Sequence, residues 1–181
     1  MSTAPATQPD GDRLSLLYHL SQQFNSSLDL DEVLNRVMDE VISAVKAERG
    51  FVMLKDNNEK LTFRVARGME QQTIEDPEFQ VSRSVIDKVA SEGKPILTSD
   101  AQSDLRFNMR QSVMTMGLRA ILCVPLKIKD KLTGVIYVDN RLHAGIFTPA
   151  DMELLTYIAS SAAIAIENGG ARNYVTFTDP D

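Results

Sequence analysis

The sequence has little of the chemistry that metal centres and disulfides need. Its 181 residues contain one cysteine, two histidines and no tryptophan. Cys123 alone cannot form an internal disulfide or a cysteine metal cluster, and its place in the apolar run AILCVPLKI predicts a buried core thiol. His19 and His143 are far apart in the sequence and form no HxxH or HExxH motif. We therefore expect no metal and no cofactor.

Long hydrophobic runs and an excess of positive charge are also missing. No apolar run approaches the roughly 20 residues that cross a membrane, and the N-terminal MSTAPATQPDGD lacks the basic and apolar regions of a signal peptide. The net charge of -6 opposes binding to nucleic-acid phosphates and to anionic lipid surfaces. These absences predict a cytoplasmic protein that binds neither nucleic acid nor membrane.

Motifs typical of enzymes are absent as well. The sequence contains no G-x-S-x-G nucleophile turn, no Walker glycine loop and no G-x-G-x-x-G fingerprint. With isolated histidines and a single cysteine in an apolar run, it offers no evident nucleophile and base. We expect no catalytic activity.

What remains is the composition of one packed domain, with 43% hydrophobic and 24% charged residues. Apolar residues spaced by three or four predict helices, and short apolar or alternating runs predict strands. Asp29 is the expected N-cap of the second helix. The predicted helices are 13–24, 29–47, 82–93 and 148–168, and a further short helix is expected within 101–117. The predicted strands are 51–54, 61–65, 95–100, 119–128 and 132–140.

The order of these elements predicts the fold class. Strands joined by hairpins, rather than strands alternating with helices, favour an antiparallel sheet with helices on its faces, the α+β class. Residues 1–11 are expected to be a disordered leader and residues 12–168 the folded domain. Gly169-Gly170 is expected to end the last helix, which leaves 169–181 as a tail or linker.

From Leu14 to about Asn168 the sequence resembles the GAF domain family, the small-molecule sensor modules of signalling proteins. The resemblance is strongest in LRAILCVPLKIKDKLTGVIYVDNR followed by FTPADMELLTYIASSAAIAIEN. It implies a GAF-like sheet of about six antiparallel strands, with the terminal helices packed on one face and a ligand pocket under loops and short helices on the other. It also implies a bacterial regulatory domain that forms a homodimer through its terminal helices and controls an output domain such as a cyclase, kinase or phosphatase.

One motif of the family accompanies cyclic nucleotide binding and is incomplete here. It consists of Asn, Lys, Phe, Asp and Glu, and the matching positions hold Asn140, Arg141, Phe147, Asp151 and Met152. Arginine thus replaces the lysine, and methionine stands in place of the glutamate. The resemblance therefore implies a small-molecule ligand without identifying it as a cyclic nucleotide.

The same residues also have a purely structural interpretation, which we call the clasp: Asn140, Arg141, Phe147 and Asp151. Thr148 followed by a proline and then Asp151 is a typical helix start, with an N-cap and an acidic third position. Arg141 could pair with Asp151 and fasten the end of a strand to this helix, while Phe147 fills the core.

The ligand itself is expected near the segment 100–119. Arginine and asparagine side chains there can bind a carboxylate or a phosphate, and phenylalanine and methionine can form apolar walls. The candidate contacts are Arg106, Phe107, Asn108, Arg110, Met116 and Arg119. If these are only core and surface residues, the alternative is a ligand-free dimerisation module with a degenerate pocket. Two other branches of the family, the free methionine sulfoxide reductases and the bilin-binding domains, use cysteines that this sequence lacks.

Overall fold

The computed structural model describes residues 9–24, 29–75, 81–101, 104 and 117–177. Within them a five-stranded antiparallel sheet has the order β2-β1-β5-β4-β3. The strands are β1 (Arg49–Lys55), β2 (Leu61–Gly68), β3 (Ile96–Thr98), β4 (Ala120–Ile128) and β5 (Lys131–Asn140). The helices are α1 (Pro9–Phe24), α2 (Leu30–Val45), α3 (Arg83–Glu92) and α5 (Pro149–Phe177).

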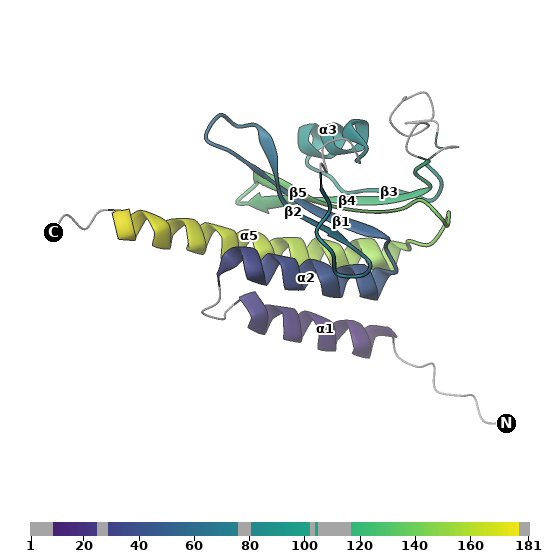
Figure 1. Ribbon diagram of the computed structural model, residues 1–181, viewed down its shortest axis with the longest axis horizontal. Helices are drawn as coiled ribbons and strands as arrows, with labels where there is room; N and C mark the ends of the chain where they lie inside the picture. The colour runs from purple at the N-terminus through teal and green to yellow at the C-terminus, as the bar shows by residue number, and fades with distance from the viewer. Residues whose placement is uncertain (1–8, 25–28, 76–80, 102–103, 105–116, 178–181) are drawn as a thin grey trace.

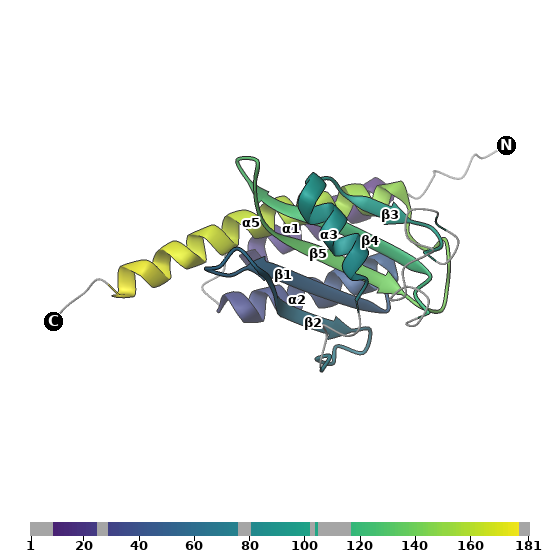
Figure 2. The ribbon, with the colours of Figure 1, turned by 90° about the horizontal axis from the view of Figure 1, so that it is seen from above.

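The sheet lies between two helical layers (Figure 1). The helices α2 and α5 cover one face, and α1 packs outside them. The shorter α3 covers the other face, where it lies over the central strands β4 and β5 (Figure 2). The α+β class and the GAF-like architecture are confirmed, and five of the approximately six expected strands lie in the described residues.

Two cores result from the alternation of side chains along the strands. On β5, Ile136 and Val138 face α2 and α5, whereas Val135 and Tyr137 face α3. Cys123 belongs to the core under α3, as expected of a buried thiol, and burial raises its pKa. The central strands are therefore buried on both faces.

Local signals place the helix ends. Asp29 caps α2, its carboxylate accepting from the backbone N–H of Asp31 at 3.4 Å. Ser82 caps α3, and Gly93 ends that helix with a φ of +66°, a left-handed conformation that glycine adopts without strain. Asp29 is the N-cap that the sequence predicts, and the helix α3 ends at Gly93, where the predicted helix 82–93 ends.

Two predicted boundaries are wrong. The first helix begins at Pro9, inside the expected leader 1–11, because a proline in the first turn loses no helical hydrogen bond. The last helix continues through Gly169-Gly170 to Phe177. A glycine inside a helix costs about 1 kcal/mol relative to alanine, which weakens a helix without ending it. The C-terminal part of α5 extends past the sheet (Figure 1), and within the described residues no helix has the length and apolarity to cross a membrane.

Candidate functional site

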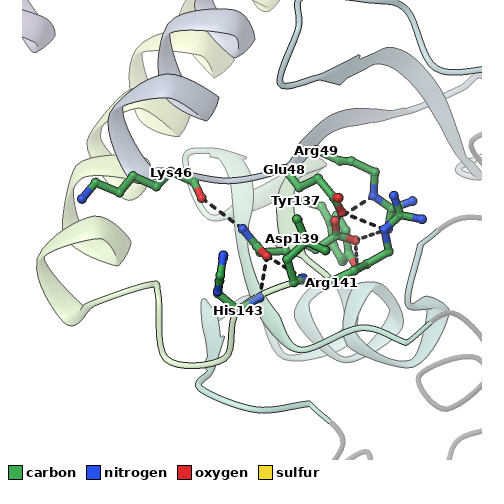
Figure 3. Close-up of polar contacts among 9 residues, drawn as sticks. Lys46, Glu48, Arg49, Tyr137, Asp139, Arg141 and His143 are labelled. Carbon is green, nitrogen blue, oxygen red and sulfur yellow. Dashed lines mark hydrogen bonds and ion pairs between the residues drawn. The ribbon is translucent and has the colours of Figure 1, made fainter.

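The candidate site lies where β5 ends, and we call it the β5-end cluster: Tyr137, Asp139, Asn140 and Arg141, with their partners Lys46, Glu48, Arg49 and Ser82. Figure 3 shows Tyr137, Asp139 and Arg141 beside Lys46, Glu48 and Arg49. Four elements meet here. The end of the strand β5 lies beside the start of β1, and β1 follows the end of α2. The N-cap of α3 contacts β5 from the opposite face of the sheet to α2.

A buried ion pair is the centre of this cluster. The guanidinium of Arg49 donates from Nε to Oδ1 of Asp139 at 2.8 Å and from Nη2 to Oδ2 at 2.6 Å. Their side chains are 5% and 0% exposed. Both residues lie on the α3 face of the sheet, because they follow the alternation of Phe51 and Tyr137. A two-point geometry of this kind fixes the relative position of β1 and β5.

Tyr137 extends the pair to α3. Its hydroxyl donates to Oδ2 of Asp139 at 2.9 Å and accepts from the backbone N–H of Ser82 at 3.2 Å. Burial raises the pKa of Asp139, an effect that the hydrogen bonds and the charge of Arg49 partly offset. Burial also raises the pKa of Tyr137 well above its ordinary value, and the neighbouring carboxylate adds to this. The first turn of α3 is therefore bonded to the ion pair through one hydroxyl.

Asn140 connects the cluster to α2. Its Nδ2 donates to the backbone carbonyl of Lys46, the C-cap of α2, at 3.3 Å. Its Oδ1 accepts from the backbone N–H groups of Leu142 and His143 at 2.8 and 2.9 Å and so shapes the loop that follows β5 (Figure 3). The backbone N–H of Glu48 donates to the carbonyl of Asp139 at 2.9 Å. The end of α2 and the end of β5 are thus held together.

The partner of Arg141 differs from the one expected for the clasp. Its Nε donates to Oε1 of Glu48 at 2.7 Å, so it fastens β5 to the start of β1. Asp151 instead accepts from the backbone N–H of Thr148 at 2.9 Å, and its own N–H donates to the Thr148 hydroxyl at 3.1 Å. This reciprocal pair is a capping box, which uses the carboxylate that the Arg141–Asp151 pair would have needed. The expected pair between Arg141 and Asp151 is wrong.

Glu48 responds to this arrangement through its pKa. Partial burial raises it, but the hydrogen bond and the charge of Arg141 lower it by more, so that it lies below its ordinary value of 4.5. Phe147, also part of the clasp, is 4% exposed and packs in the core with α5, where it was expected.

Of the predicted ligand contacts, only Arg119 is among the described residues. Its Nη2 donates to Oδ2 of Asp100 at 2.9 Å, and its backbone N–H donates to the carbonyl of Asn140 at 3.1 Å. This residue therefore lies directly beside the β5-end cluster. The other candidates lie outside the described residues, namely Arg106, Phe107, Asn108, Arg110 and Met116.

Sequence reasoning missed the Arg49–Asp139 pair. The available signal is a charged residue at the end of each of two apolar strands, in RGFVML and in GVIYVDN. Because side chains alternate along a strand, Asp139 points to the same face of the sheet as Val135 and Tyr137, which is the face that α3 covers. Its buried carboxylate therefore needs a polar or charged partner there. The sequence does not show that Arg49 is that partner, since this depends on the pairing of β1 with β5.

A groove of about 360 Å³ opens onto the cluster. Its walls include Glu48, Arg49, Met69, Glu70, Ile74 and Arg141. In the part of the chain that the structure describes, no group of three or more histidine, cysteine or acidic side chains could hold a metal ion. The cluster consists of charged and hydrogen-bonding groups that contact one another and so connect the N-cap of α3, the strands β1 and β5 and the C-cap of α2.

Comparison with known families identifies most of the chain. The family model described as GAF domain matches residues 29–166. This range begins at the cap of α2 and includes the whole sheet, α3 and most of α5.

Two curated relatives give the sequence context. The chain is 25% identical over 173 residues to the dual 3',5'-cyclic-AMP and -GMP phosphodiesterase 11A of Takifugu rubripes, covering 85% of this chain and 19% of that protein. It is 28% identical over 157 residues to the nitrogen fixation protein AnfA of Azotobacter vinelandii, covering 85% of this chain and 30% of that protein. The chain thus spans less than a third of the length of these relatives.

Solved structures show the same fold. The GAF domain of the phosphoenolpyruvate-protein phosphotransferase of Acinetobacter superposes with a TM-score of 0.71 at 20% identity, covering 94% of this chain and 97% of that chain. The free methionine-R-sulfoxide reductase of Neisseria meningitidis, in complex with its substrate, reaches the same TM-score at 15% identity, covering 95% and 98%. A GAF domain of a larger protein and a free-standing reductase therefore share this architecture, and identity at this level shows the fold alone.

Proposed function

The chain belongs to the GAF domain family, and from this premise we propose that it is a non-catalytic regulatory domain of a cytoplasmic, bacterial signalling protein. It binds a small molecule on the α3 side of the sheet, near the segment 100–119, and passes the signal through α1 and α5 to an output domain. The output domain is a cyclase, a kinase, a phosphatase or another signalling enzyme. Relatives described as a phosphodiesterase and as a hybrid signal transduction histidine kinase support this context.

The β5-end cluster is the observation that carries the proposal. Tyr137 bonds the N-cap of α3, Arg49 and Asp139 join β5 to β1, and Asn140 bonds the C-cap of α2. Arg119, the one expected ligand contact that lies among the described residues, donates its backbone N–H to the carbonyl of Asn140 at the same end of β5. A ligand that favours one position of α3 therefore also favours one position of α2, which packs against α1 and α5.

The terminal helices supply the surface through which the signal leaves. Among the side chains of these helices that the structure describes, four large apolar ones are exposed, Leu14 and Tyr18 on α1 and Tyr157 and Ile164 on α5. Each pair is spaced by four or seven residues and so lies on one side of its helix. We propose that these residues form a homodimer interface in which the terminal helices of two copies pack together.

The test combines a ligand screen with a measurement of mass. The purified chain is heated with cyclic nucleotides, amino acids, 2-oxo acids or small aromatic compounds, and light scattering gives its oligomeric state. A ligand at 100 times its dissociation constant stabilises the folded state by about 2.7 kcal/mol, which at this size raises the melting temperature by several degrees. Arg119→Gln should remove the shift, whereas Arg36→Gln, an exposed change on α2, should not.

The outcomes separate the candidate functions. A saturable shift that depends on Arg119 supports the sensor. A dimer that no compound stabilises favours the ligand-free dimerisation module, for which the exposed apolar residues of α1 and α5 are the supporting observation. Conversion of any compound in the screen into a product would contradict the non-catalytic proposal.

A further inference from the structure

A second groove lies between α3 and the tips of the β1–β2 and β4–β5 hairpins. Its volume is about 630 Å³, within the range of small-molecule pockets. The walls include Lys60, Leu61, Arg83, Asp87, Ala90 and Leu132. These residues come from the β1–β2 hairpin, from α3 and from β5.

Arg83 differs from five of the other arginines that the structure describes. Five others form ion pairs with carboxylates, namely Arg49, Arg64, Arg67, Arg119 and Arg141. The guanidinium of Arg83 instead lies 5.9 Å from the ring centre of Phe63, and it has no carboxylate partner among the described residues. The ring limits its conformations but leaves its N–H groups available to an anion in the groove.

Asp87 lies one helical turn after Arg83 and has no ion-pair partner among the residues that the structure describes. The two side chains share a side of α3 but do not pair with each other. A base four residues before an acid is the less favourable order for a helical pair. The neighbouring Lys88 and Glu92 have the same spacing and order and approach only to 3.9 Å. The groove thus contains a separated positive and negative charge.

The remaining residues of the groove add a second positive charge and an apolar surface. Lys60 adds a second positive charge. Lys55 and Glu59 form an ion pair with each other at 3.2 Å, so their charges largely cancel. The half-buried side chains of Leu61 and Leu132 form an apolar floor. The dipole of α3 favours a negative group near Arg83, at the N-terminus of the helix.

We propose that this groove binds a zwitterionic small molecule with an apolar substituent, such as an apolar α-amino acid. Arg83 and Lys60 bind its carboxylate, Asp87 binds its ammonium group, and the substituent rests on Leu61 and Leu132. This proposal rests on the groove beside α3 and not on the ligand contacts expected in the segment 100–119, so neither proposal depends on the other.

The test is isothermal titration calorimetry of the full chain with three matched probes. L-Phenylalanine carries both charges, 3-phenylpropionate lacks the ammonium group, and phenethylamine lacks the carboxylate. We expect L-phenylalanine to bind, and each analogue to bind at least about tenfold more weakly, since each loses a charge-assisted hydrogen bond.

Variants identify the groove as the site. Arg83→Gln should weaken L-phenylalanine binding by about tenfold or more, and Asp87→Asn should reduce it to the level of 3-phenylpropionate. Arg36→Gln is the matched surface control and should change nothing. The proposal is overturned if L-phenylalanine gives no saturable heat, if Arg83→Gln binds like the wild type, or if 3-phenylpropionate binds as tightly as L-phenylalanine. Loss of binding in Arg119→Gln but not in Arg83→Gln would also overturn it.

Discussion

Replacing Arg49 with methionine should destabilise the domain in a way that depends on pH. The carboxylate of Asp139 is fully buried, and Arg49 is the cation that it contacts at 2.6 and 2.8 Å. Methionine fills part of the same space without the charge. The carboxyl group must then either remain ionised without a cation or take up a proton, and both cost free energy at neutral pH.

The free energy needed to protonate Asp139 is the upper limit of this destabilisation, because the carboxyl group can always take up a proton instead of staying ionised. Holding the carboxyl group neutral at pH 7, against its ordinary pKa of 3.8, requires about 4.4 kcal/mol, because each pKa unit corresponds to about 1.36 kcal/mol. Burial already raises the pKa of Asp139 in the wild type, so part of this cost is present there. We expect Arg49→Met to lose about 3 kcal/mol at pH 7. At pH 4.5 the upper limit is only about 1 kcal/mol.

The sign follows from linkage. A carboxyl group whose pKa is raised by folding contributes most stability below its ordinary pKa and loses it as the pH rises through the raised value. Since Arg49→Met raises the pKa of Asp139 further, the variant should approach wild-type stability as the pH falls from 7 to 4.5. Urea unfolding at the two pH values measures this, at constant m-value.

Two controls sharpen the experiment. Arg49→Met combined with Asp139→Asn removes both charges but keeps an oxygen that accepts from Tyr137, and it should recover much of the stability lost at pH 7. Arg64→Met breaks an exposed pair with Asp31 and should cost about 0 to 1 kcal/mol at either pH. Equal losses at pH 7 and 4.5, or a loss below about 1 kcal/mol at pH 7, would refute the electrostatic reasoning.

Three further predictions concern the same region. Tyr137→Phe leaves the buried N–H of Ser82 without its acceptor, so it should cost about 1 to 3 kcal/mol and speed hydrogen exchange in the first turn of α3; unchanged exchange there would contradict the link to that helix. Glu48→Gln removes a carboxyl group whose pKa Arg141 lowers, so the melting temperature should fall less steeply than in the wild type as the pH drops below about 4.5; parallel curves would count against it. Thr148→Ala removes the capping hydroxyl of α5 and should cost about 1 kcal/mol in urea unfolding, a prediction that fails if its midpoint equals that of the wild type.

The sequence predicts the fold well because its signals are local. The apolar stripe of α2, the hairpins, the N-cap Asp29 and the helix end at Gly93 each depend on a few neighbouring residues. The helical Gly169-Gly170 was misjudged because glycine lowers helix stability by an amount that the rest of a long helix can offset.

The candidate site was less predictable because its contacts are distant in sequence. Asn140 and Arg141 were identified, but their partners Lys46 and Glu48 lie more than 90 positions away. Which acid an arginine contacts depends on strand order and register, and these follow from the packing of the whole sheet.

The position of β5 between β1 and β4, buried on both faces, also has an evolutionary consequence. One residue inserted or deleted within this strand would exchange its two faces, sending the Asp139 carboxylate toward the apolar core of α2 and α5 and the side chain of Val138 toward Arg49. The loop of residues 142–146 has no such constraint, and its side chains are mostly exposed. Descendants of this gene should therefore keep the length of β5 fixed, whereas changes of length should be tolerated better in the loop beyond His143, the last residue that Asn140 bonds.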